Sequence, residues 1–380
     1  MEPVAPPERT PKQLLELARR DRAAAERAVG ELSPDEQLAL VCEAPLAARA
    51  RILDLVPEPE KLVPRMPPAE LCFTVKAIGL SDAAWLLEYA TPEQTVAALD
   101  LDAWRGQELD TRAANEWLEA LARTSPDARL RAVEALDTEL LTLALRTRIG
   151  VVQRPDDAEG WDPPPGSRTL EGKFHFWALA EGDDLADVVA LLETLFEGAY
   201  WDYFRLMLAL QWELVSDSEE WALRWRTGRL EDLGFPTWDD AMRIYRYLEP
   251  ERRSELPADE QPLDVAAWDL PVWIPQLPTL RGDGERLFRA IAALDDDERR
   301  ASFYAFVALA NRAAVADRLP LGDAESTPRA IAKTARLASA GLAHLADAHA
   351  LDDAGVLRRV SLERLFRIGA NLDPKGAKSG

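Results

Sequence analysis

The chain has few of the residues that build metal centres and disulfide frameworks. It contains two cysteines, Cys42 and Cys72, and three histidines among its 380 residues. No cysteine pair has metal-site spacing, and a disulfide-dense secreted scaffold is excluded, so we expect two buried, unbridged thiols. His344 and His349 lie about 140° apart around a helix and do not share a face as zinc ligands do. The sequence therefore assigns no metal ligand.

Long apolar runs are also missing. No stretch reaches the roughly 18 apolar residues that a membrane span needs. The best candidate, residues 199–212, contains Asp202 and Arg205. The N-terminus has no apolar core of signal-peptide length. These absences predict a cytoplasmic protein without a membrane span.

The common catalytic motifs are absent as well. The segment from Gly166 to Lys173 has one residue too many for a phosphate-binding loop, and Gly-x-Ser-x-Gly does not occur. The acidic segment 100–111 places Gly106 one position too late for a calcium-binding EF-hand and lacks the final glutamate. We therefore assign no catalytic residue and no cofactor.

What the chain has in excess is negative charge. It holds 67 acidic and 45 basic residues, a net charge of -22, which argues against general nucleic-acid binding. Residues 151–270 contain 27 acidic and 11 basic residues and eight of the twelve tryptophans. This composition favours another protein, of basic character, as the partner.

Prolines set a rhythm in the first part of the chain, at positions 34, 45, 57, 68 and 92. Ser33-Pro34 and Thr91-Pro92 each place a hydroxyl at the N-cap, a proline at the first helical position and an acid in the first turn. Such short helices cannot bury their apolar faces alone and must stack on neighbours. We expect a solenoid-like array of stacked helix pairs, with an irregular bundle as the alternative.

The predicted fold is therefore all-α. Longer helices are expected at about 110–122 and 125–148, and later at 284–294, 296–318, 327–348 and 353–368. Between the two groups, residues 151–152 and 169–177 favour a small β-hairpin. The expected organisation is a loose tail at 1–10, a superhelical domain at 11–149, a linker at 150–182, an acidic tryptophan-rich region with a proline-rich connector at 183–281, a helical bundle at 282–370 and a tail at 371–380.

Two sets of residues are candidates for function. The first is an aromatic interaction surface formed by Trp201, Tyr203, Trp212, Trp221 and Trp225, because tryptophan and tyrosine are suited to anchor partners. A tryptophan-rich core is the alternative interpretation of the same residues. The second set is a polar constellation of Asn311, Arg312, Asp317 and Asp323, which either specifies helix packing or lines a small-molecule pocket.

Several phrases of the sequence are familiar. Segments 70–80, 90–94, 99–104, 231–236 and 310–312 resemble an uncharacterised family of bacterial all-helical proteins, over about residues 35–370. That resemblance implies no established activity. Residues 31–100 are also similar, more loosely, to the cytosolic N-terminal superhelix of bacterial magnesium transporters. This second resemblance implies a shape and cation binding by acidic residues, but not transport, because the membrane part and the nucleotide-sensing domains are missing.

Together these observations predict a non-enzymatic scaffold or adaptor that binds another protein. The alternative is a small-molecule or divalent-cation sensor, or an enzyme, with its pocket in the C-terminal helical region. The oligomeric state does not follow from the sequence.

Overall fold

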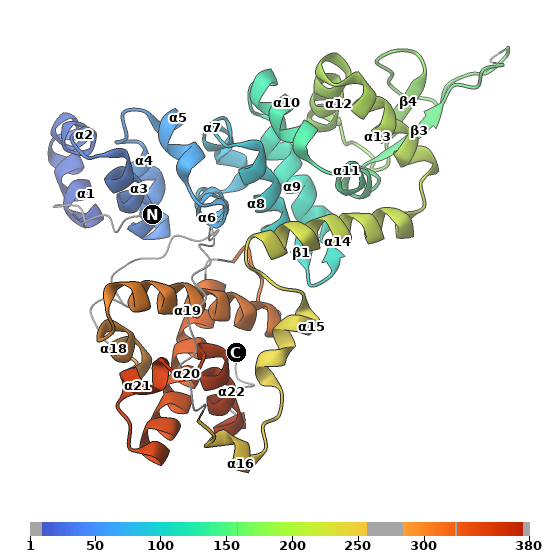
Figure 1. The fold of residues 1–380 in the computed structure, drawn as a ribbon. Coiled ribbons are helices and arrows are strands. Elements are labelled where there is room, and N and C mark those ends of the chain that lie inside the picture. Colours follow the sequence, from blue (N-terminus) through green and yellow to red (C-terminus); the bar gives the residue numbers. More distant parts are fainter. Residues whose placement is uncertain (1–9, 158, 257–283, 324, 375–380) are drawn as a thin grey trace. The chain divides into compact units, whose positions relative to one another are not determined.

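The computed structural model describes residues 10–157, 159–256, 284–323 and 325–374 (Figure 1). The chain divides into two compact units, one that ends at Gly228 and one that begins at Arg229. The predicted tail at 1–10 lies almost wholly outside the described residues, as do much of the proline-rich connector and the end of the predicted C-terminal tail. Cys42 and Cys72 are buried and unbridged, as expected.

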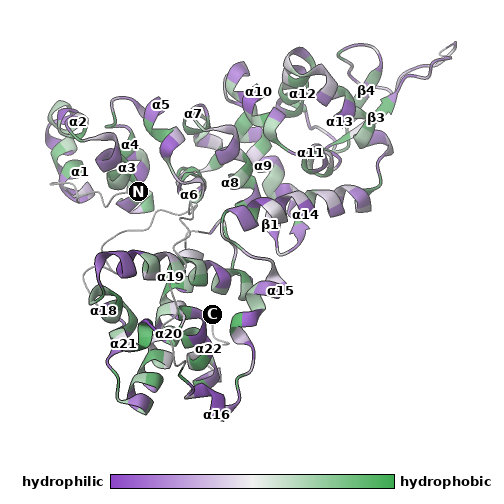
Figure 2. Cartoon of the chain, viewed as in Figure 1, coloured by the Kyte–Doolittle hydropathy of each residue, from purple (hydrophilic) through white to green (hydrophobic). Residues whose placement is uncertain are grey.

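The first unit is a succession of short helices with two small antiparallel sheets. Its helices pack on neighbours along the chain: α4 on α6, α6 on α8, α8 on α10, and α10 on α12. Figure 2 shows hydrophobic and hydrophilic residues interspersed along these helices, as expected where one face of each is buried. The elements are α1 (Pro11–Arg20), α2 (Arg22–Gly30), α3 (Pro34–Glu43), α4 (Leu46–Leu53), α5 (Pro59–Leu62), α6 (Pro68–Ile78), α7 (Ala84–Leu87), α8 (Pro92–Asp102), β1 (Trp104–Arg105), β2 (Glu108–Leu109), α9 (Thr111–Ala122), α10 (Pro126–Ala135), α11 (Thr138–Leu145), β3 (Ile149–Gln153), β4 (Phe174–Ala178), α12 (Ala186–Gly198), α13 (Tyr200–Trp212) and α14 (Val215–Asp232), with 3-10 turns at Val63–Arg65 and Leu80–Asp82.

Hydroxyl caps start several of these helices, as the proline rhythm predicts. The side chains of Thr10, Ser33 and Thr91 each accept a hydrogen bond from the backbone N–H three residues later, and a Glu or Gln at that position bonds back to the cap. A proline follows each cap, where no backbone N–H is needed. Ser125 begins α10 in the same way, without the returning bond. These caps satisfy backbone donors that would otherwise lack partners.

A buried arginine ties three of the short helices together. Arg49 of α4 lies against Glu70 of α6, with Nη1 2.6 Å from the carboxylate Oε2. The same guanidinium donates to the backbone oxygens of Cys42 and Ala44 at the end of α3, at 2.6 and 3.2 Å, and to the Thr74 hydroxyl at 3.2 Å. Both charged side chains are almost fully buried. The hydrogen bonds of Arg49 therefore fix the end of α3 and the helix α6 relative to α4.

The predicted β-hairpin is confirmed, with slightly different ends. β3 and β4 pair antiparallel, and Gly150 faces Trp177 across the strands. A Cβ atom at Gly150 would overlap the Trp177 ring, so only glycine lets the indole cover the strand. The pair β1–β2 was not predicted: its two-residue turn begins at Gly106, whose φ of +66° favours glycine.

The prediction of one long helix at 125–148 is wrong, because this segment forms two helices. The chain breaks at Leu136, which is extended (φ -77°, ψ 145°), and restarts as α11. Leu136 is itself buried. Because α10 buries Ala128, Ala132 and Val133 and α11 buries leucines, the apolar periodicity runs across the break without marking it.

The second unit is a helical bundle around a core that includes Phe306, Leu342 and Phe366. Its elements are α15 (Trp238–Ala241), a 3-10 turn at Met242–Tyr245, α16 (Pro250–Arg253), α18 (Arg286–Ala292), α19 (Asp296–Ala316), α20 (Ser326–His349), α21 (Asp353–Leu357) and α22 (Leu362–Leu372). The single helix expected at 353–368 is two helices here. Ser361 caps α22 by accepting from the N–H of Arg364, and this local signal starts a new helix.

The helices α20 and α22 cross at backbone contact. A Cβ atom at Gly341 of α20 would overlap the carbonyl oxygen of Leu365, and one at Gly369 of α22 would overlap that of Leu337. On each helix, the glycine lies four residues from the leucine whose carbonyl faces the other helix's glycine. These pairs are Leu337 and Gly341 on α20, and Leu365 and Gly369 on α22. The crossing requires glycine at both positions because no side chain fits between the two backbones.

We predict that Gly341→Ala or Gly369→Ala destabilises the second unit by about 2 kcal/mol or more, because the added methyl forces the helices apart. Urea unfolding followed by circular dichroism measures this change. Gly228→Ala in α14 is the matched control, since a Cβ there meets nothing within 4 Å. This control should be neutral or stabilising by up to about 1 kcal/mol, from helix propensity alone. Equal effects at Gly228 and Gly341 would contradict the close crossing.

Candidate functional site

The helix α13 presents two tryptophans to solvent. The side chains of Trp201 and Trp212 are 72% and 69% exposed. They are 11 residues apart, which returns to nearly the same helical face after three turns. Between them on this face lie the exposed Arg205 and the half-buried Leu208. A large indole exposed at each end of one face is unusual for a side chain that only supports the core.

Tyr203 does not belong to this exposed face, and its place in the predicted interaction surface is corrected. Its side chain is fully buried. The ring makes edge contacts with Phe196 of α12 and Phe174 of β4, at centroid distances of 5.4 and 6.3 Å. Tyr203 is therefore part of the core, whereas an interaction surface remains a prediction for the exposed tryptophans.

The helix α14 carries a second exposed aromatic pair. Trp221 and Trp225 are 42% and 46% exposed and stack on each other, with ring centroids 5.8 Å apart and planes 27° apart. Ser218 and Ala222 of the same helix are buried. Arg226 joins this helix to α8 by donating to the backbone oxygen of Asp100 at 2.8 Å, and to the β1–β2 turn by donating to that of Gly106 at 3.3 Å. We call Trp201, Trp212, Trp221 and Trp225 the tryptophan surface.

The surroundings of the tryptophan surface are acidic. Residues 200–221 hold five acidic residues and one basic residue. Asp217, Glu219 and Glu220 at the start of α14 are exposed. The basic residue, Arg205, forms an ion pair with Asp202. Negative charge therefore dominates near Trp212 and the start of α14, while Arg224, Arg226 and Arg229 lie further along that helix.

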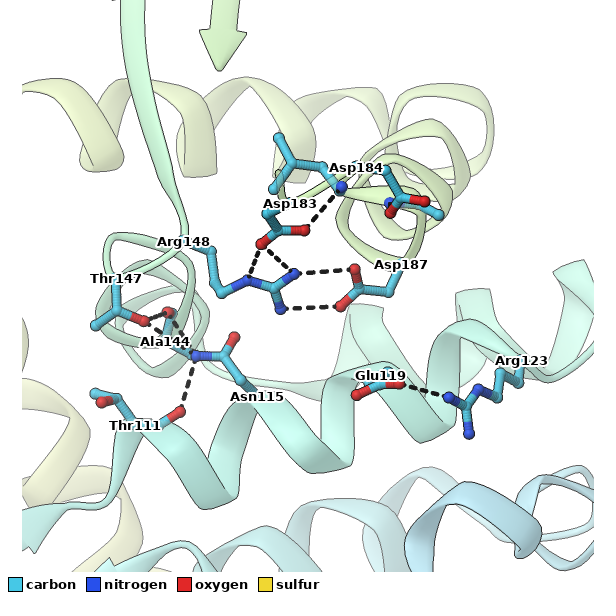
Figure 3. A network of polar contacts seen from close by, with 12 residues as sticks. Thr111, Asn115, Glu119, Arg123, Ala144, Thr147, Arg148, Asp183, Asp184 and Asp187 are labelled. Atoms are coloured by element: carbon cyan, nitrogen blue, oxygen red, sulfur yellow. Dashed lines mark hydrogen bonds and ion pairs between the residues drawn. The ribbon is translucent and has the colours of Figure 1, made fainter. Parts of the chain in front are cut away.

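A separate polar network lies in the first unit (Figure 3). Some of its residues line a pocket of about 310 Å³. Arg148 lies between Asp183 and Asp187, with guanidinium–carboxylate distances of 2.8 to 3.2 Å. Asn115 of α9 donates to the backbone oxygen of Ala144 at 3.0 Å. No sequence pattern marks this cavity, because its lining comes from separate segments: Thr111, Arg112, Asn115, Glu116, Glu119, Thr147 and Arg148.

This network works as a structural clamp. The carboxylates of Asp183 and Asp187 occupy the donors of Arg148, so the guanidinium is not free to bind an anion. Asp183 also accepts from the N–H of Leu185 at 2.9 Å, which supports the left-handed backbone of Leu185 (φ 54°) before α12. This backbone hydrogen bond, with Arg148 beside it, lowers the pKa of Asp183.

The four residues of the predicted polar constellation make contacts that run to different partners. Arg312 pairs with Glu363 of α22 at 2.6 Å. Asp317 accepts from Lys333 of α20 at 2.7 Å and from the Tyr245 hydroxyl at 2.9 Å. Asp323 accepts from the backbone N–H of Glu325, and Asn311 is buried. These contacts of Arg312 and Asp317 join helices of the second unit.

Within the described ranges, no three His, Cys, Asp or Glu side chains gather in a way that could hold a metal ion. His344 and His349 instead both contact Ser254, through its hydroxyl at 3.0 Å and its backbone oxygen at 2.6 Å. In the same described part of the chain, no helix has the length and apolar character needed to cross a membrane.

Comparison with protein families identifies the chain. The model of a family of unknown function, DUF6178, matches residues 26–373. The protein belongs to this family. The match agrees with the resemblance to an uncharacterised family, whereas nothing in the comparisons links residues 31–100 to magnesium transporters. Neither the comparison with curated proteins nor that with solved structures gives a match for this member of the family.

We predict that Asp183→Ala lowers the free energy of unfolding by about 1–2 kcal/mol near neutral pH, because Leu185 and Arg148 both lose a partner. Asp183→Asn keeps an acceptor for Leu185 and should lose less. The folded-state pKa of Asp183 is depressed. Its stabilisation is therefore complete above the unfolded-state pKa of about 3.9 and is lost as the pH falls through the lower folded-state value.

Urea unfolding of wild type and variant over a series of pH values checks this sign. The difference between the two proteins should shrink as the solution is acidified below about pH 4. Asp156→Asn, which removes the same charge from an exposed loop residue, is the control and should leave stability unchanged. A deficit for Asp183→Ala that persists unchanged in acid would show that the charge does not contribute.

Proposed function

We propose that this protein is a non-enzymatic scaffold that docks a basic segment of another protein on its tryptophan surface. The observation that carries the proposal is the exposure of Trp201 and Trp212 on one face of α13. Tryptophan is the residue type most enriched at the energetic centres of protein interfaces. Leaving such side chains in water has no benefit for the isolated fold, because their burial would be favourable.

The charge around the tryptophans favours a cationic partner. Exposed acids near the start of α14 supply attraction, and indole faces bind Lys and Arg side chains through cation–π contacts. The chain itself already uses this chemistry. Arg224 lies 5.1 Å from the Trp221 ring and Arg226 lies 4.9 Å from the Trp104 ring. A basic partner would repeat these contacts between two proteins.

The spacing of the anchors suggests the form of the partner. Trp201 and Trp212 are separated by about 16 Å along the helix axis, at 1.5 Å per residue. A basic helix or extended segment of similar length can contact both indoles at once. Two anchors engaged together gain affinity over either one alone.

We predict that Trp201→Ala and Trp212→Ala each weaken binding of a fluorescent oligo-lysine peptide by about tenfold, the loss of one anchor of about 1.4 kcal/mol. Fluorescence anisotropy with the full chain measures the dissociation constant. Affinity should also fall as salt is raised, because the attraction is partly between exposed charges.

Trp85→Ala is the matched control, because Trp85 is an exposed tryptophan outside α13 and α14. It should bind as the wild type does. Oligo-glutamate of equal length should not bind. Undiminished binding by folded Trp201→Ala and Trp212→Ala proteins, or equal binding of the two peptides, would overturn the docking surface.

A further inference from the structure

The helix α14 carries an apolar stripe that is exposed to solvent. The stripe begins at Leu214, whose side chain is 65% exposed and whose carbonyl oxygen accepts from the N–H of Ser218 at 3.2 Å. Trp221 and Trp225 follow Leu214 after seven and eleven residues, and both are exposed. At 3.6 residues per turn, the three side chains project within about 40° of one another around the helix. We call Leu214, Trp221 and Trp225 the α14 stripe.

The two sides of the α14 stripe differ in chemistry. Ser218 and Ala222, which are buried, lie about 40° and 80° from the middle of the stripe on one side. Asp217 and Glu220, which are exposed, lie about 60° and 120° from it on the other side. The stripe therefore lies between the buried face of α14 and an acidic, solvent-exposed face. A partner placed on the stripe meets apolar side chains first and carboxylates along one edge.

The spacing of the α14 stripe favours a helical partner. Leu214 and Trp221 are separated by about 10.5 Å along the helix axis, and Trp221 and Trp225 by about 6 Å, at 1.5 Å per residue. Residues on one face of a second helix recur at these same distances, seven and four positions apart. Residues on one face of an extended segment recur about every 6.6–6.8 Å, so none lies about 10.5 Å from another. The stripe therefore matches a helix that packs alongside α14.

The charge beside the stripe favours a basic helix. Neither Asp217 nor Glu220 forms an ion pair within the described ranges, so both carboxylates are open to a cation from outside. Arg224, a basic residue on the same side of α14, already lies over the Trp221 ring, 5.1 Å from its centroid. A second copy of the chain would bring a further net charge of -22, and like charges weaken association. A helix of another protein, with basic side chains, is therefore the complementary occupant.

We propose that the α14 stripe binds an amphipathic, basic helix of the docking partner. The apolar side chains of this helix, seven and four residues apart, lie over Leu214, Trp221 and Trp225. Its Lys or Arg side chains face Asp217 and Glu220. The inference rests on the proposed docking function and specifies the form of the partner along α14. Burial of the stripe supplies affinity, and the carboxylates along one edge set the side on which the basic residues lie.

Two peptides of equal length and equal leucine and lysine content test the form of the partner on the full chain. One places its leucines at helical spacing, and the other alternates leucine with lysine as a strand does. Fluorescence anisotropy should show at least tenfold tighter binding of the helical-period peptide. Circular dichroism difference spectra should show that this peptide gains helix when it binds.

Substitutions in the stripe test where the helix binds. Leu214→Ala and Trp225→Ala should each weaken binding of the helical-period peptide by about tenfold, because each removes one apolar contact. Leu179→Ala is the matched control, since Leu179 is a 55% exposed leucine of the same unit outside α13 and α14, and it should change nothing. The double variant Asp217→Asn and Glu220→Gln should weaken binding about threefold or more and reduce its salt dependence.

Equal binding of the two peptides, or undiminished binding by folded Leu214→Ala and Trp225→Ala proteins, would overturn the helical partner. If Trp201→Ala and Trp212→Ala still weaken oligo-lysine binding in that case, the docking function stands without a helix on α14. If they do not, the docking function itself fails. A wild-type chain that sediments as a dimer, and as a monomer after Trp225→Ala, would also overturn the proposal, because the stripe would then bind a second copy.

Discussion

Short helices are the constraint on which this architecture depends. A helix of eight or ten residues is unstable alone in water, and much of the first unit consists of helices of that length. The chain compensates at both ends of the helices. Hydroxyl caps followed by proline satisfy the first turns, and arginine side chains donate to backbone oxygens where helices end. Arg49 does this for α3, and Arg146 donates to the backbone oxygens of Ala209 and Glu213 at the end of α13.

This use of guanidinium groups explains why arginine suits the interior better than lysine. The chain contains 38 arginines and seven lysines. A planar guanidinium with five donors can reach a carboxylate, a hydroxyl and two carbonyls at once, as Arg49 does, whereas an ammonium has three donors around one point.

The sequence is sufficient to predict what is decided locally. A hydroxyl residue followed by proline marks the start of a helix, as at Ser33-Pro34, Thr91-Pro92 and Ser125-Pro126. This signal spans only three or four residues. Alternating apolar residues from Lys173 to Trp177 likewise mark a strand. The burial of a side chain and the lining of a pocket depend on contacts between distant segments, and they cannot be predicted in this way. Tyr203 and Trp201 are two residues apart, yet Phe174 and Phe196 cover only the first of them. The cavity lined by Arg148 cannot be predicted from the sequence either, because two separate segments, 111–119 and 147–148, build it.

The crossing of α20 and α22 has a mechanical consequence. Packed helices commonly adjust to one another by small sliding movements, which side chains absorb by changing rotamer. No side chain lies between Gly341 and the Leu365 carbonyl, or between Gly369 and the Leu337 carbonyl. A shift along either axis would drive a neighbouring Cβ atom into a carbonyl oxygen. The pair is therefore locked against shear, and a force applied to one helix is passed to the other without loss through deformable side chains.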